Sequence, residues 1–199
     1  MTKNTKFALV TVLVLSPAVF AASRPTVRAS ILPNSRLWVS GTSTVRSFEC
    51  KATALDAKIE VANADMPREV MSGQKAVQTV VVKVTPKQLD CANSTMNEHM
   101  LKALKADKNS LIEFRMSSYD IAQSTGAIKG KLSGSLSLGG VTKNIAFDAK
   151  ATNGANGALH VVGAYPLTMS EFGLKAPSLM MGTMKVGNKV TVNFDLLVK

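Results

Sequence analysis

Histidine, cysteine and aromatic side chains are scarce in this chain of 199 residues, which has two histidines, two cysteines, one tryptophan and two tyrosines. Zinc sites combine several His, Cys or carboxylate ligands at set spacings, and nucleophile motifs need a partner histidine. Neither pattern surrounds His99 or His160. We therefore expect no enzyme activity, no metal site and no cofactor. We interpret His99 as a hydrogen-bond partner that fixes a helix, and His160 as part of a strand face.

Acidic residues are also few, with 13 Asp and Glu against 24 Lys and Arg, which gives a formal net charge of +11. The positive charges are scattered singly along the chain, with few aromatic residues between them. Surfaces that read nucleic acid gather their basic residues or interleave them with aromatic ones. We therefore predict no nucleic-acid partner, and a cationic surface that makes transient contact with an anionic membrane.

No apolar run is long enough to span a bilayer, which takes about 20 residues. The longest run, from Phe7 to Phe20, follows Lys3 and Lys6 and ends in small residues around Ala21. A charged head, a short apolar segment and a small-residue cleavage site are typical of a secretory signal peptide. We predict cleavage and a periplasmic or secreted protein, an uncleaved anchor being the alternative. Cleavage removes two lysines and no acidic residue, so the formal charge falls from +11 to +9.

The predicted leader divides the chain into a signal peptide (residues 1–21), a polar lead-in (residues 22–35) and one folded domain (residues 36–199). Export places Cys50 and Cys91 in an oxidising compartment, where a pair of cysteines is expected to form a disulfide. Two free, buried thiols are the alternative. The bridge would close a loop of about 40 residues, for which the chain-entropy model gives at most about 4 kcal/mol.

Most of the domain reads as strands, because apolar and polar residues alternate along it. The clearest example is the last segment, where the apolar residues are Val190, Val192, Phe194, Leu196 and Val198. We expect about eight strands, with residues 36–50 as the first and residues 66–75 as a loop. Short turns between strands imply antiparallel pairing, and closing the sheet into a barrel removes its exposed edges. A two-layer sandwich is the alternative.

The interior of such a barrel is either filled by its own side chains or holds one small ligand. Few aromatic residues are available to fill it, and small residues are spread along the strands, at Gly130, Gly134, Ala149, Gly163 and Ala164. We expect these to face inward and leave a ligand cavity. A ligand-free barrel with a stress-protective role is the alternative.

One helix interrupts the strands, in the stretch "CANSTMNEHMLKALK" (residues 91–105). Thr95 and Glu98 fit a capping box, and an apolar stripe follows at helical spacing, formed by Met96, Met100, Ala103 and Leu104. We predict a short helix that covers one end of the barrel as a lid. A crossover helix packed outside the sheet is the alternative.

Methionines are numerous late in the chain, at Met169, Met180, Met181 and Met184. Thioethers are ligands for Cu(I), so a periplasmic copper-binding protein is a second hypothesis. Methionine also fills irregular apolar space, and no histidine or cysteine lies near these four in the sequence.

Five stretches occur in the order found in a known family: "STVRSF" after Trp38, "NEHM" at residues 97–100, "IEF" at residues 112–114, "LSLGGVTKNIAFDAK" at residues 136–150 and "LTMSEFGL" at residues 167–174. On these motifs the chain resembles the YceI-like family of exported polyisoprenoid-binding proteins over about residues 36–199. The resemblance implies an all-β, eight-stranded, antiparallel lipocalin-like barrel with one short helix near a barrel end.

The resemblance also implies a function: an exported carrier or sequestering protein that holds a long-chain isoprenoid lipid, such as a polyprenyl lipid or a quinone-like tail. Alternation and position relative to the motifs suggest an apolar lining formed by Phe114, Met116, Leu132, Leu136, Phe147, Val162, Phe172 and Phe194. The lipid is the expected partner, and the sequence does not define an oligomeric state.

Overall fold

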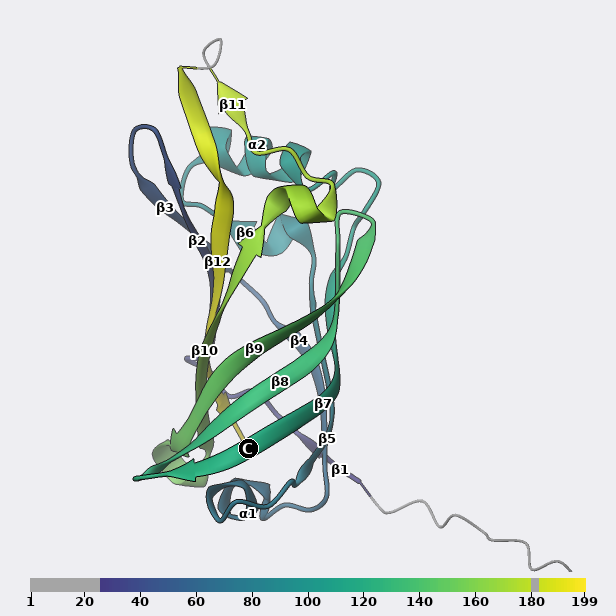
Figure 1. Cartoon of the computed structure of the whole chain (residues 1–199), viewed down its shortest axis with the longest axis vertical. Helices are drawn as coiled ribbons and strands as arrows, with labels where there is room; N and C mark the ends of the chain where they lie inside the picture. Colours follow the sequence, from purple (N-terminus) through teal and green to yellow (C-terminus); the bar gives the residue numbers. More distant parts are fainter. Residues whose placement is uncertain (1–25, 180–182) are drawn as a thin grey trace, which may run out of the picture.

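The computed structural model describes residues 26–179 and 183–199, and one antiparallel sheet dominates it (Figure 1). Its strands are β1 (Val27–Ala29), β2 (Arg36–Ser43), β3 (Ser47–Ala52), β4 (Asp56–Val61), β5 (Val77–Val84), β6 (Leu89–Asp90), β7 (Ile112–Ser124), β8 (Ala127–Leu138), β9 (Val141–Asn153), β10 (Leu159–Thr168), β11 (Ser178–Leu179) and β12 (Met184–Val198). Their order is β1-β4-β5-β7-β8-β9-β10-β12-β2-β3-β6, and β11 pairs with β12. The predicted signal peptide lies outside the described residues.

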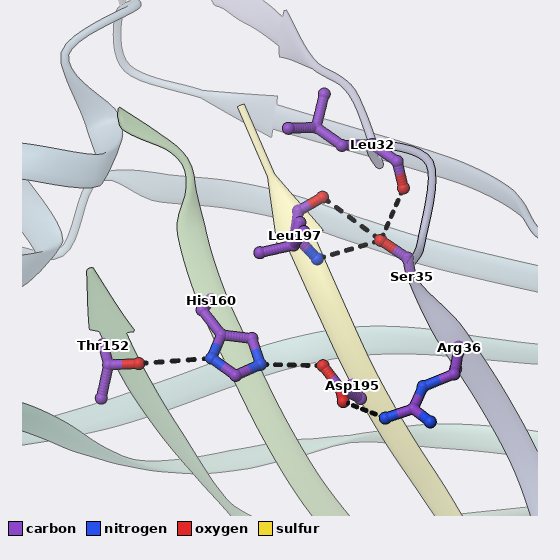
Figure 2. A network of polar contacts seen from close by, with 7 residues as sticks. All are labelled: Leu32, Ser35, Arg36, Thr152, His160, Asp195 and Leu197. Carbon is purple, nitrogen blue, oxygen red and sulfur yellow. Dashed lines mark hydrogen bonds and ion pairs between the residues drawn. The ribbon is translucent and has the colours of Figure 1, made fainter. Parts of the chain in front are cut away.

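The sheet curls into a barrel because the segment after β1 returns to β12. Ser30 exchanges two backbone hydrogen bonds with Lys199, and the Leu32 amide donates to the Leu197 carbonyl at 2.8 Å. The Ser35 hydroxyl fixes this junction, since it accepts from the Leu197 amide at 3.0 Å and donates to the Leu32 carbonyl at 2.7 Å (Figure 2). The all-β antiparallel barrel is therefore confirmed, and the two-layer sandwich is wrong.

The residues that the structure describes form twelve strands, where eight were predicted. Residues 36–50 are not one strand but the hairpin β2–β3, whose turn is held by Ser43: its hydroxyl accepts from the amides of Val45 and Arg46 at 3.3 and 3.1 Å. Three further strands, β1, β6 and β11, have only two or three residues each. The sheet begins at Val27, inside the predicted lead-in.

Two α-helices lie at opposite ends of the barrel, α1 (Met66–Met71) and α2 (Ser94–Ala103) (Figure 1). We expected a loop where α1 forms. Pro67 is in its first turn, where a missing amide hydrogen does no harm, and Met66 and Val70 are buried. Within the described residues, no helix has the length and apolar character needed to span a membrane.

Helix α2 begins two positions earlier than the predicted capping box requires. Its N-cap is Asn93, whose side-chain oxygen accepts from the Met96 amide at 2.9 Å, so the interpretation of Thr95 as the cap is wrong. Short 3-10 helices complete the fold at η1 (Pro86–Gln88), η2 (Ala155–Gly157) and η3 (Met169–Phe172).

A polar network runs across the outer face of the barrel (Figure 2). His160 on β10 contacts Asp195 on β12 at 2.8 Å and Thr152 on β9 at 3.4 Å, and Arg36 on β2 donates to Asp195 at 2.6 Å. Four neighbouring strands are thereby linked. The hydrogen bond from Arg36, and then that from His160, lowers the pKa of the Asp195 carboxyl below its ordinary value.

Candidate ligand-binding cavity

The barrel encloses a cavity of about 760 Å³ whose wall is almost entirely apolar. Its walls come from strands on all sides of the barrel and from both helices. From Val190 to the end of β12 every second residue faces the cavity, namely Val190, Val192, Phe194, Leu196 and Val198. The period of two that identified the strand thus also identifies its inward face, because successive side chains point to opposite sides of a sheet.

Six of the eight residues predicted to line the interior lie on the cavity wall: Phe114, Met116, Leu132, Leu136, Phe147 and Phe194. The structure places the other two elsewhere. Val162 lies opposite Lys150 and Asp195 in the sheet, on the outer face that also carries His160. Its neighbour Val161 lines the cavity instead. The pair of adjacent valines breaks the alternation of this strand, so the pair by itself does not show which of the two faces inward.

The prediction that Phe172 lines the interior also differs from the structure, in which this residue does not border the cavity. It belongs to η3 and is 0% exposed, packed with residues such as Leu167 and Leu174 in the apolar cluster at the α2 end of the barrel. Its role is to close the wall beside the mouth. The same turn carries Met169, which does reach the cavity.

An aromatic group covers part of the wall, with Phe147 at its centre. The Phe147 ring centroid lies 5.4 Å from that of Phe114, 5.8 Å from that of Phe194 and 6.1 Å from that of Tyr165, all in tilted or edge-on arrangements. These separations are in the range where aromatic pairs attract beyond simple burial. The group joins β7, β9, β10 and β12 on the inner face of the sheet.

Glycines allow these rings to lie close against the sheet. A Cβ atom at Gly163 would overlap the Phe194 ring, and one at Gly134 would lie 2.7 Å from a Phe114 ring carbon. The expectation that small inward residues leave empty space is therefore only partly right. Gly130 and Ala149 border the cavity, whereas Gly134 and Gly163 make room for rings, and Ala164 is exposed.

The two ends of the cavity differ in polarity. At the closed end, Met66 and Val70 of α1 are 2% and 5% exposed and pack with Ile128 of β8 in an apolar cluster. At the other end the cavity wall includes polar side chains, from Ser43, Arg46, Asn93, Thr95 and His99. We call this end the mouth.

Helix α2 lies over the mouth. The cavity wall there includes Met96, His99, Met100 and Ala103 of the helix, together with Leu104, which caps its C-terminal end. The predicted apolar stripe therefore faces the interior, and the crossover helix outside the sheet is wrong. None of the ten residues of α2 is buried. The helix is thus a thin cover, in contrast to α1.

Two attachments hold the start of α2. The predicted disulfide between Cys50 and Cys91 is confirmed, and it joins β3 to the segment that leads into the helix. Asn97 makes the second attachment, since its side chain accepts from the Cys91 amide at 2.8 Å and donates to Asp90 at 2.9 Å. That bond lowers the pKa of the Asp90 carboxyl. Asn97 has the helix-fixing role that we assigned to His99, whose side chain makes no hydrogen bond in the part of the chain that the structure describes.

Two tyrosines bring hydroxyl groups to the apolar wall, and burial raises the pKa of both. The Tyr119 hydroxyl accepts from the Val77 amide at 3.0 Å. The Tyr165 hydroxyl makes no hydrogen bond to any described residue. It is therefore a polar group on the wall that a ligand could meet.

Most of the methionines that we considered as Cu(I) ligands lie outside the residues that the structure describes. Met169 is buried and borders the cavity, but Met180, Met181 and the side chain of Met184 lie outside the described residues. Residues 26–179 and 183–199 contain no group of three or more His, Cys, Asp or Glu side chains that could hold a metal ion.

The sequence of residues 33–198 matches the YceI-like domain family. The chain belongs to the YceI-like family. No curated protein matches it. Among solved structures it is similar to BcnA of Burkholderia cenocepacia, with a TM-score of 0.62 and 19% identity over 83% of this chain and 96% of that one.

Two other solved structures share the YceI-like fold. The YCEI protein of Campylobacter jejuni has a TM-score of 0.57 and 19% identity, over 74% of this chain and 82% of that one. A polyisoprenoid binding domain from Saccharophagus degradans, implicated in plant cell wall breakdown, has a TM-score of 0.58 and 11% identity, over 86% of this chain and 97% of that one. At these identities the likeness establishes the fold alone.

Proposed function

We propose that this YceI-like protein holds the tail of a long-chain isoprenoid lipid, such as a polyprenyl lipid or a quinone, inside the barrel. It acts as a carrier or a sequestering protein in the periplasm or outside the cell, and it performs no catalysis. The observation that carries the proposal is the cavity of about 760 Å³ with its apolar wall. The polyisoprenoid-binding domain among its structural relatives supports this ligand class.

The size of the cavity argues against a barrel whose interior is simply packed. Small-molecule sites typically measure about 300–1,000 Å³, and this cavity falls within that range. Cavities in protein cores cost about 24 cal/mol per Å³, so 760 Å³ left unfilled would cost about 18 kcal/mol. That exceeds the whole stability of a typical domain, about 5–15 kcal/mol. Solvent or ligand must fill the space, and an apolar wall favours an apolar ligand.

The distribution of polar and apolar side chains along the cavity also suits an amphiphilic ligand. Hydrocarbon burial contributes about 0.8 kcal/mol per methylene group, so a branched tail gains most along the apolar walls toward α1. Ser43, Arg46 and His99 at the mouth offer partners to a polar head. The Tyr165 hydroxyl offers a further partner on the apolar wall.

A cavity-filling substitution tests the proposal. Leu136→Trp adds a large ring on the cavity wall, where overpacking costs about 1–3 kcal/mol, so we expect the affinity for a long-chain polyprenol to fall about five- to 150-fold. The matched control is Val162→Trp, which adds the same ring on the outer face. Binding is measured by loading each folded variant with polyprenol and quantifying the lipid after gel filtration. Equal retention by both variants would contradict binding inside the barrel.

A further inference from the structure

We propose that the mouth of the barrel docks on an anionic membrane surface through the tip of the β2–β3 hairpin, with Val45 at its apex. Val45 enters the boundary between headgroups and acyl chains, and the basic residues around it contact lipid phosphates. The purpose of the contact rests on the proposed function, because docking brings the cavity mouth to the source of its lipid. The contact itself is inferred from the exposure of Val45 and from the positive charge around it.

Val45 is the most exposed large apolar side chain in the described residues, at 65%. It lies in the turn between β2 and β3, and that turn is rigid, since Ser43 accepts backbone hydrogen bonds from both Val45 and Arg46. Val45 also borders the cavity mouth. A fixed, exposed apolar side chain beside an apolar cavity is costly in water and is stabilised by insertion into a lipid interface.

Basic side chains surround this apex. The tip of the hairpin is joined to β12 by the Thr44 amide, which donates to the Lys185 carbonyl at 2.9 Å, so Arg46 and Lys185 belong to neighbouring tips. The segments 40–50, 168–179 and 183–190 contain four basic and two acidic side chains, a balance of +2. The basic ones are Arg46, Lys175, Lys185 and Lys189, and none forms an ion pair with another described residue.

The opposite end of the barrel has the reverse balance. Residues 60–76, which include α1, contain two basic and three acidic side chains, a balance of −1. Lys75 there pairs with Asp120 at 2.8 Å, and Lys58 of β4 pairs with Glu60 at 2.7 Å. The most exposed apolar side chain and a positive balance of charge therefore lie together at the mouth. This pairing of features fits a lipid surface, to which each Lys or Arg adds about 1 kcal/mol when the lipid is anionic.

Vesicle flotation of the full mature protein tests the proposal, with phosphatidylcholine vesicles that contain or lack phosphatidylglycerol. Arg46→Glu removes one positive charge and adds a negative one, so binding to the anionic vesicles should fall about 25-fold at low salt. The Arg46 side chain makes no hydrogen bond or ion pair to a described residue, so the fold should survive. The matched control is Arg68→Glu on α1, an exposed arginine at the closed end, which should leave binding unchanged.

A second pair of variants tests the apolar part of the contact. Val45→Ser should weaken vesicle binding about fivefold, whereas Val27→Ser, at a valine that is 44% exposed on β1, should not. The proposal would be overturned if Arg46→Glu and Arg68→Glu weakened vesicle binding equally. It would also be overturned if vesicle binding depended neither on the charge of the lipid nor on Val45. Binding to a protein partner that Arg46→Glu abolishes, while vesicles stay unbound, would overturn it as well.

The outcome separates docking from lipid carriage. A Lys185→Glu protein that floats poorly but still retains polyprenol loaded in solution supports docking as a distinct step, because Lys185 is exposed and does not border the cavity. Wild-type protein that retains polyprenol but never floats with anionic vesicles refutes docking and leaves the proposed function intact. If flotation of the protein depends on Val45 and Arg46 but the protein retains no polyprenol, docking is supported and isoprenoid carriage is refuted.

Discussion

Replacing Gly163 with alanine tests whether the shape of the cavity depends on aromatic rings that lie in close contact with glycines. The new Cβ atom would overlap the Phe194 ring and lie 2.9 Å from the Asp148 carbonyl oxygen, so the ring must move toward the cavity. Overpacking of this kind costs about 1–3 kcal/mol. For a domain of this size we expect Tm to fall by about 2–12 °C. Polyprenol retention should fall as well, because the displaced ring takes up cavity space.

Gly130→Ala is the matched control for this prediction. A Cβ atom there meets nothing closer than 3.6 Å, and a glycine that alanine can replace without strain gains about 0.4–1 kcal/mol from the smaller entropy of the unfolded chain. Thermal denaturation should therefore move Tm in opposite directions for the two variants. A Gly163→Ala protein as stable as Gly130→Ala would show that the Phe194 ring does not lie against Gly163.

A double-mutant cycle then identifies the cause of the loss. If the Phe194 ring is the obstacle, Gly163→Ala should cost less in a Phe194→Leu background, with a coupling of about 0.5–3 kcal/mol between the two sites. The part of the cost that comes from the Asp148 carbonyl should persist in that background. Additive losses would show that the ring does not lie against Gly163.

Three other predictions concern the lid, the outer network and the cavity wall. The double variant Cys50→Ser and Cys91→Ser should lose up to about 4 kcal/mol of stability in urea titrations, and an unchanged midpoint would mean that the bridge braces nothing. The pKa of Asp195 is lowered in the folded state, so its contribution to stability is present above its ordinary pKa of about 3.9 and is lost as the pH falls through the lower folded value. Asp195→Asn should therefore be less stable than the wild type at pH 7, with a gap that closes in acid; a gap that is constant with pH would contradict this. Tyr165→Phe should weaken binding of a ligand that carries a hydrogen-bond acceptor by about two- to twelvefold but leave binding of a pure hydrocarbon unchanged, as measured by competition. Equal effects on both ligands would exclude the hydroxyl from binding.

The strands were predictable from sequence where one face is apolar along the whole segment. On β12 the alternation from Val190 to Val198 identified both the strand and its inward side. On β10 the pair Val161 and Val162 breaks the alternation, and the choice of Val162 was wrong. A signal was available in that strand, because Leu159, Tyr165 and Leu167 share the face of Val161.

The helices and turns were harder to predict from the sequence than the strands. Pro67 and Gly73 suggested a loop for the segment that forms α1, although Met66 and Val70 have the helical spacing and proline is tolerated in a first turn. Phe172 looked like a lining residue because it is large and apolar. Its position in η3 instead buries the side chain in the apolar cluster beside the cavity. The hairpin turn at Val45 was missed because no glycine or proline marks it, and a serine side chain holds it instead.

Binding of an isoprenoid inside the barrel can be tested by mass spectrometry of an organic extract from the wild-type protein, purified from a bacterial periplasm without detergent. We expect an isoprenoid lipid in near-stoichiometric amount, which should be depleted in the matched extract of Leu136→Trp and retained in that of Val162→Trp. An extract of well-folded wild-type protein that contains no isoprenoid, or one whose lipid content is the same in all three proteins, would contradict this binding.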